Sequence, residues 1–158
     1  MRRIAMRATA VIAASLLLAG CAAEDESSSG PPAPNGYALS ATLDDGTMLW
    51  NDRSDGSGLT DLMLESPEGR FVHSCLGEAP MICWDDPAAP TMLLVIAPPE
   101  ATTAELSWYG QTYPLTAGTP LDDEAPAVFA LVLPDYEPND EGWTLEVKDA
   151  AGEVVMTS

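Results

Sequence analysis

The sequence is poor in basic residues, because six Lys and Arg stand against 25 Asp and Glu. Three of the six lie within the first 20 residues, so the rest of the chain holds only Arg53, Arg70 and Lys148. A surface of this kind repels nucleic acid and anionic lipid headgroups alike. We therefore expect no nucleic-acid partner.

The sequence also lacks the residue combinations of common catalytic sites. His73 is the only histidine, no serine lies in a Gly-x-Ser-x-Gly turn, and there is no glycine-rich phosphate loop. Carboxylates suited to glycoside cleavage are present, but 25 acids make some close pair inevitable. His73 alternates with Phe71 and Cys75, which favours a packed or surface histidine on one strand face. We predict that the protein is not an enzyme and uses no cofactor.

No apolar run is long enough to span a bilayer, which needs about 20 apolar residues. The run Val11 to Leu18 follows Arg2, Arg3 and Arg7 and precedes Leu18-Ala19-Gly20-Cys21. This pattern resembles the signal peptide and lipobox of bacterial lipoproteins. The resemblance implies cleavage before Cys21, a diacylglycerol on the Cys21 sulfur and a further acyl chain on the new amino terminus. Two or more chains give stable anchoring, so we expect an extracytoplasmic protein anchored to the cell membrane by lipid on Cys21.

The composition divides the chain into three parts. Residues 1–20 are the expected signal peptide. Residues 21–36 are the lipidated cysteine and a tether, because residues 22–36 contain no large apolar side chain that could offset the entropy of ordering. A flexible tether of this length reaches about 20 Å. Residues 37–158 are long enough for a single domain with its own core.

From Tyr37 onward, apolar residues alternate with polar ones at a period of two, which is typical of half-buried strands. Two segments, 92–97 and 127–133, are apolar on both faces and bounded by prolines, as in strands at the middle of a packed sheet. Twelve Gly and 14 Pro interrupt any helical stripe. The alternating segments are Tyr37 to Leu43, Glu105 to Trp108 and Trp143 to Lys148. The pattern predicts an all-β fold, an antiparallel β-sandwich of about eight to ten short strands.

Residues 91–157 carry turn and strand patterns in a recognisable order. Val95-Ile-Ala-Pro-Pro, Ala104-Glu-Leu-Ser-Trp-Tyr-Gly, Val128-Phe-Ala-Leu-Val-Leu-Pro and a hairpin from Val147 to Val155 follow one another. This order resembles the immunoglobulin-like module of many small actinobacterial lipoproteins. The resemblance implies an immunoglobulin-like β-sandwich and carries no chemistry with it.

Two cysteines remain besides Cys21, namely Cys75 and Cys83. In an oxidising compartment an even pair favours a disulfide. Eight residues are too short an offset for the inter-sheet disulfide of antibody domains, so we expect a bond across the end of a hairpin. A reactive or metal-binding pair is the alternative, but no nearby His or Cys completes a site. We predict a disulfide and no metal site.

Acid-rich turns offer a second kind of candidate site, because Ca²⁺ takes six to eight oxygen ligands. The segments 51–62 and 135–146 come nearest to an EF-hand loop, but Arg53 and Leu62 occupy ligand positions in the first and Asp140 replaces the glycine of the second. Solvated acidic turns are the plainer interpretation, with Ca²⁺ binding as the alternative.

Four tryptophans complete the candidates. Trp108 and Trp143 fall on predicted inward faces, whereas Trp84 lies at a loop, between Cys83 and Asp85. Tryptophan is common at binding hot spots but is more often buried. If an aromatic pair serves recognition of a partner, we expect it to be Trp84 with Trp50.

These features together favour a lipid-anchored β-sandwich that serves as a non-enzymatic interaction or accessory module in the cell envelope. Its acidic surface suits a basic envelope protein as partner, in an association that depends on salt. The alternative function is a lipoprotein that binds Ca²⁺ or a small ligand.

Overall fold

The computed structural model describes residues 33–34, 36–52, 57–86, 90–135, 137 and 139–158. The segment Pro31–Ser158 forms one compact unit. The described residues contain no helix and so none that could cross a membrane. They form twelve strands: β1 Ala38–Thr42, β2 Met48–Asp52, β3 Thr60–Glu65, β4 Phe71–Gly77, β5 Met81–Trp84, β6 Met92–Ala97, β7 Ala101–Trp108, β8 Gln111–Pro114, β9 Thr116–Ala117, β10 Ala127–Val132, β11 Trp143–Asp149 and β12 Val154–Thr157.

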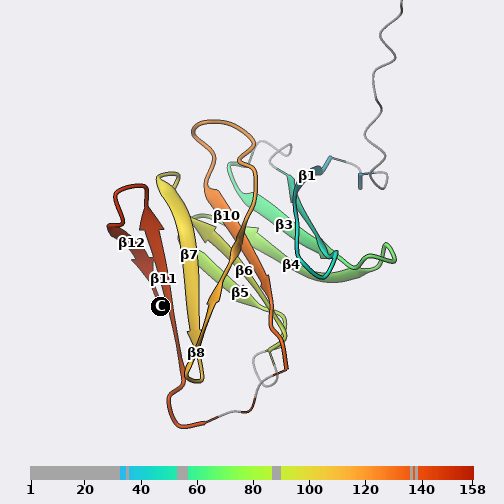
Figure 1. Cartoon of the computed structure of the whole chain (residues 1–158). Helices are drawn as coiled ribbons and strands as arrows, with labels where there is room; N and C mark the ends of the chain where they lie inside the picture. The colour runs from blue at the N-terminus through green and yellow to red at the C-terminus, as the bar shows by residue number, and fades with distance from the viewer. Residues whose placement is uncertain (1–32, 35, 53–56, 87–89, 136, 138) are drawn as a thin grey trace, which may run out of the picture. The chain divides into compact units, whose positions relative to one another are not determined.

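The strands make three antiparallel sheets (Figure 1). Sheet A has the order β1-β2-β3-β4, sheet B the order β5-β6-β10-β9, and sheet C the order β12-β11-β7-β8. The expected all-β, sandwich-like architecture is confirmed. The number of strands is larger than the expected eight to ten. Strands β8 and β9 contain only four and two residues, which are too few to show an alternation of apolar and polar residues.

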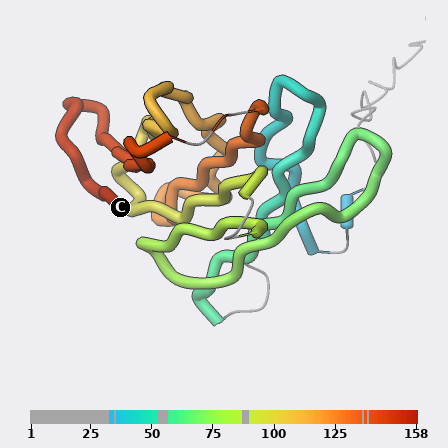
Figure 2. The backbone as a smooth tube through the Cα atoms, turned by 90° about the horizontal axis from the view of Figure 1, so that it is seen from below, coloured from blue at the N-terminus to red at the C-terminus, as the bar shows by residue number. Residues whose placement is uncertain are grey.

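Sheet B lies between the other two sheets and is apolar on both faces. Leu94, Ile96 and Val128 pack with side chains of sheet A, whereas Leu93, Val95 and Phe129 pack with side chains of sheet C. The prediction that segments 92–97 and 127–133 form the middle of a packed sheet is thus confirmed. Figure 2 shows β5 and β6 between the N-terminal strands and the C-terminal ones.

Sheets A and B are joined at both pairs of edges. At one, a disulfide links β4 to β5. At the other, the Ser40 hydroxyl donates to the carbonyl of Thr119 (3.0 Å) and the Thr119 amide donates to the carbonyl of Ser40 (2.8 Å). Gly118 permits this approach, because a Cβ there would lie 2.7 Å from Val128 Cγ2 and closer still to Ser40 Oγ. The core between these two sheets is therefore closed at its sides.

One continuous segment passes from sheet C to sheet B. Strand β8 pairs with β7, and β9 pairs with β10, with only Leu115 between them. The Leu115 amide donates to the Ala104 carbonyl of β7 (2.9 Å), and its side chain is buried in the core between the two sheets. The chain thus changes sheets without a loop.

Strand β1 departs from the expected alternation. A register shift between Leu39 and Ala41 interrupts its pairing with β2. Leu39, expected on the same face as Ala41 and Leu43, is instead 45% exposed, and the polar Ser40 is buried. The physical reason is a β-bulge, which turns the residues on either side of it toward opposite faces of the sheet.

Tyr37 fixes the start of the domain on the outer face of sheet A. Its hydroxyl donates to Asp61 Oδ2 on β3 at 2.7 Å. Since β2 lies between β1 and β3, the Tyr37 side chain crosses β2 to reach this acceptor. Burial, the hydrogen bond to Asp61 and the charges of Asp61 and Asp52 raise the pKa of Tyr37 from 10.0 to about 12.

This shift predicts a loss of stability at high pH. A folded-state pKa above the unfolded value stabilises the fold fully below pH 10 and loses that contribution as the pH rises through about 12. We expect wild type to exceed Tyr37→Phe in free energy of unfolding below pH 10, and the difference to shrink near pH 12. Urea unfolding of both proteins at the two pH values measures it, and an unchanged difference would contradict the assignment.

Candidate functional site

Three tryptophans from two sheets meet at one end of the core between sheets B and C. Trp84 ends β5, Trp108 ends β7, and Trp143 begins β11 as the cross-strand partner of Trp108. The ring centroid of Trp84 lies 5.1 Å from that of Trp108 and 5.2 Å from that of Trp143, the second contact being edge to face. Both separations suit favourable aromatic pairs. We call Trp84, Trp108, Tyr109 and Trp143 the aromatic cluster.

The turn between β7 and β8 adds Tyr109 to this cluster. Tyr109 and Gly110 have φ angles of 45° and 82°, the left-handed pair that a type I′ hairpin turn requires. The turn places the Tyr109 ring edge-on to Trp108 at 4.8 Å. The Tyr109 amide donates to the carbonyl of Gly142 (2.8 Å), and Asn139 Nδ2 donates to the carbonyl of Tyr109 (2.9 Å). The turn is thereby tied to the loop before β11.

Exposure differs sharply within the cluster. Trp108 is 3% exposed and forms its base, Trp84 and Tyr109 are half-buried, and Trp143 is 37% exposed. Trp143, expected in the core because it falls on an inward strand face, is not buried, so that expectation was wrong. Its side chain does point between the sheets, but it stands at the first residue of β11, where the core opens to solvent.

Acidic residues adjoin the aromatic cluster in sequence on both sides. Asp85 and Asp86 follow Trp84, and Asp140 and Glu141 precede Trp143 by a few residues. Asp85 acts within its own loop, since its carboxylate accepts from the amides of Thr91 and Met92 (2.8 Å each). Burial alone would raise the pKa of Asp85, but the hydrogen bonds from Thr91 and Met92 outweigh it and hold the pKa below its ordinary value.

Glu141 and Trp143 line one side of a cavity of about 270 Å³ at this end of sheet C. The opposite side is the β7–β8 hairpin, with Gly110 and Gln111 at its turn. The lining also includes Gly142 and three residues that carry hydroxyl groups, namely Ser107, Thr112 and Thr144. The cavity thus combines a carboxylate with several hydrogen-bonding groups.

The structure does not bring Trp50 to this site. Trp50 lies on β2 in sheet A and is 2% exposed, so it has almost no surface to offer a partner. The expectation that Trp84 and Trp50 form an exposed pair is therefore wrong, and the structure places Trp84 against Trp143 instead. The sequence signal for the exposure of Trp143 was its position directly after an acidic segment and a glycine, at the very start of a strand.

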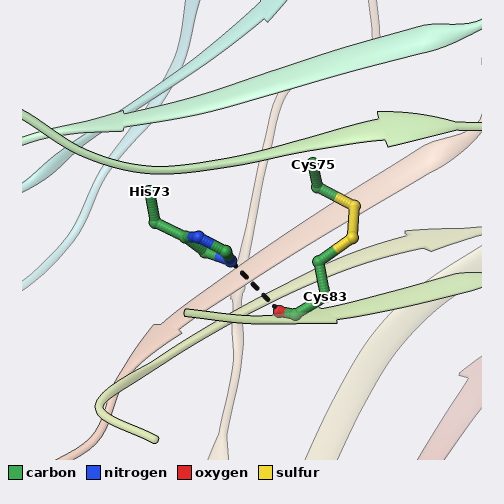
Figure 3. The surroundings of a disulfide bond; sticks show 3 residues. All are labelled: His73, Cys75 and Cys83. Atoms are coloured by element: carbon green, nitrogen blue, oxygen red, sulfur yellow. Dashed lines mark hydrogen bonds between the residues drawn. A yellow bond between two sulfur atoms is a disulfide. The ribbon is translucent and has the colours of Figure 1, made fainter. Parts of the chain in front are cut away.

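Cys75 and Cys83 form a disulfide bond, as predicted (Figure 3). The expectation that it crosses the end of a hairpin is wrong. Cys75 lies in β4 of sheet A and Cys83 in β5 of sheet B, and these strands are not hydrogen-bond partners. The three residues between the strands turn the chain from one sheet to the other, so even a short offset yields an inter-sheet bond.

His73 lies close to this disulfide bond. Its Nε2 lies 3.4 Å from the carbonyl oxygen of Cys83, to which it can only donate (Figure 3). Phe71, expected on the same strand face as His73, is exposed, and a register shift interrupts the pairing of β3 with β4 next to it. His73 therefore bridges two sheets through a backbone carbonyl, as expected of a packed histidine.

Several acidic turns use their carboxylates to cap their own backbone. Asp45 accepts from the Thr47 amide and hydroxyl (2.9 Å each), Asp122 from the Glu124 amide (3.0 Å), and Asp149 from the amides of Ala151 and Glu153 (2.9 Å each). Within the described ranges, no three His, Cys, Asp or Glu side chains are grouped to hold a metal ion. Cys21 and parts of the 51–62 and 135–146 segments lie outside those ranges.

Comparison with known proteins adds no assignment to this site. No protein-family model matches the chain, and no curated protein is significantly similar to it.

Proposed function

We propose that the protein is a lipid-anchored, extracytoplasmic binding module of the cell envelope that works without catalysis and recognises a basic partner. The observation that carries the proposal is the aromatic cluster at the open end of sheets B and C, with acidic loops next to it in the chain. Aromatic side chains dominate the energetics of protein interfaces, and acidic surroundings favour a cationic partner.

Other features support the location. The lipobox resemblance of Leu18-Ala19-Gly20-Cys21 provides the anchor, and residues 22–36 have the composition of a tether. A disulfide between Cys75 and Cys83 suits an oxidising compartment outside the cytoplasm. With three basic against 25 acidic residues after position 20, the lipid rather than the surface would hold the protein to an anionic membrane.

Crosslinking in cells tests this function. A tagged full-length chain is compared with the same chain carrying Cys21→Ser, and crosslinked proteins are identified. We expect one recurrent envelope protein with a basic surface to crosslink only to the Cys21 form, through an association that high salt weakens. A recurrent partner that is acidic or whose binding ignores salt would contradict the proposal, as would the absence of any recurrent partner.

A further inference from the structure

One side of the core between sheets B and C is open. The other sides of the two cores are closed by a disulfide, by the hydrogen bonds between Ser40 and Thr119, and by the continuous chain at Leu115. The remaining side lies between β5 and β12, the edge strands of sheets B and C, and among the described residues no hydrogen bond joins these two strands. A cavity of about 420 Å³ lies there, lined by Pro80, Ile82, Val155, Met156 and Thr157.

The walls of this open side are largely apolar. Ile82 of β5 and Val155 and Met156 of β12 are half-buried and pack against the core between the two sheets. Val155 has no partner in the pairing of β12 with β11 and is the extra residue of a β-bulge. Trp84 lies on the same face of β5 as Ile82, two residues away, so the opening continues toward the aromatic cluster.

The free edge of β12 offers backbone groups to a further strand. Of the residues that flank β12, Glu153 accepts a hydrogen bond from β11 through its carbonyl (3.0 Å), and Ser158 donates one to β11 through its amide (3.2 Å). Backbone direction alternates along an antiparallel strand, so the adjacent residues Val154 and Thr157 turn their N–H and C=O groups away from β11. Both residues are exposed. The bulge lies between them, so they keep the spacing of alternate positions in the ladder.

The free edge of β5 is occupied by β4 instead. Cys83 is bonded to Cys75 of β4, and its carbonyl oxygen lies 3.4 Å from Nε2 of His73, also on β4 (Figure 3). Edge strands are commonly protected by a charged residue or a proline, and the segment Val154–Thr157 contains neither. An added strand would therefore pair with β12.

The charge of the chain favours a basic occupant. The formal net charge is −19 at pH 7, and the described cations Arg70 and Lys148 already pair with Glu68 and Glu146. A second copy of the chain would bring the same strong negative charge to this edge, whereas a basic segment is attracted to it.

We propose that an extended segment of the basic partner pairs with β12 as an additional strand of sheet C, an inference that rests on the proposed function and states how the partner binds. The backbone of this segment exchanges hydrogen bonds with Val154 and Thr157. Every second side chain of the segment is apolar and enters the opening against Ile82. The side chains between them are basic and stay on the outer face of the sheet. In this mode of recognition the main chain supplies affinity and alternate side chains supply specificity.

Titration with synthetic peptides tests the inference. The full chain, purified in detergent, is titrated by calorimetry with a peptide in which valine and lysine alternate. A second peptide has the same side chains and charge, but its backbone amides are methylated and cannot donate. We expect the first peptide to bind and the methylated peptide to bind about tenfold more weakly, because backbone hydrogen bonds to β12 are lost.

A proline on the free edge is the matched variant. The Thr157 amide points away from β11, so Thr157→Pro removes a donor from the edge while the pairing of β12 with β11 is kept. Thr112 on β8 alternates with Pro114, so its amide points away from β7 and Thr112→Pro makes the same change at the other edge of sheet C. We expect Thr157→Pro to weaken binding of the unmethylated peptide about fivefold and Thr112→Pro to keep it within about twofold.

A second pair of variants avoids proline altogether. Val154 and Leu76 are exposed apolar residues on different edge strands, 49% and 57% exposed. Val154→Lys places a positive charge beside the bound segment and should weaken binding about threefold, whereas Leu76→Lys on β4 should not. Thermal melts of all four variants verify that each one is folded.

The outcomes distinguish this inference from the proposed function. If both peptides bind equally, or if each variant behaves like its control, charge alone holds the peptide and the assignment to β12 is wrong, while a basic partner can still be found by crosslinking. If the chain is a dimer that Thr157→Pro dissociates, a second copy occupies the edge and the inference is overturned. If no peptide binds and crosslinking finds no basic partner, both proposals fail.

Discussion

Replacing Cys75 and Cys83 together with alanine is expected to lower the free energy of unfolding by about 2.5 kcal/mol, the loop-entropy value for a closed loop of this length. For a domain of this size the loss corresponds to a fall in Tm of about 8 °C. The bond joins the edge strands of sheets A and B, so its loss also removes the covalent closure of one side of their shared core. Urea unfolding and a thermal melt of the variant and wild type measure both quantities.

Reductant supplies the matched control for this prediction. Wild type unfolded and refolded in reductant should lose the same stability as the double alanine variant, whereas the variant itself should not respond to reductant. Equal stability of wild type and the double variant under oxidising conditions would show that the bond contributes nothing to the fold.

Leu93→Ala and Leu94→Ala are each expected to lower the free energy of unfolding by about 3 kcal/mol. The two residues are neighbours in β6 and point to opposite faces of sheet B, yet both are fully buried. Leu94 belongs to the core shared with sheet A and Leu93 to the core shared with sheet C. A large loss at two consecutive strand positions is the energetic mark of a sheet covered on both faces.

A pair of neighbours in sheet C provides the contrast. Leu106 is fully buried and Glu105 is exposed, so Leu106→Ala should cost about 3 kcal/mol and Glu105→Ala less than about 0.5 kcal/mol. Urea unfolding of the four variants gives the comparison. A small effect of either Leu93→Ala or Leu94→Ala would show that one face of sheet B is open to solvent.

Much of the fold followed from local patterns in the chain. Segments 92–97 and 127–133 lack polar residues on either face, and only a sheet covered on both sides accommodates such strands. The edge strands were harder to predict. Thr116–Ala117 is too short to show a period of two. In β1, a bulge after Leu39 reverses which residues face the core, and the pattern of apolar residues in the sequence does not reveal a bulge.

The candidate site was predicted only in part. Trp84 was singled out because it lies beside a cysteine and two acids, and it does belong to the aromatic cluster. Its partner was misassigned because contact between Trp84 and Trp143 depends on how sheets B and C are stacked. The sequence also did not show that Glu141 lies next to the hairpin turn at Gly110, because only the fold brings these two distant parts of the chain together.

By itself the sequence determined the strands, the turns, the pairing of the two cysteines and the strong acidity of the chain, because period, glycine placement and charge are local properties. Only the tertiary structure decided which sheet each strand joins. That decision made the Cys75–Cys83 bond a link between sheets, buried Trp50 and exposed Trp143. The physical reason is that a strand presents the same alternation whichever sheet it enters, while the layers packed against it decide which side chains remain open to a partner.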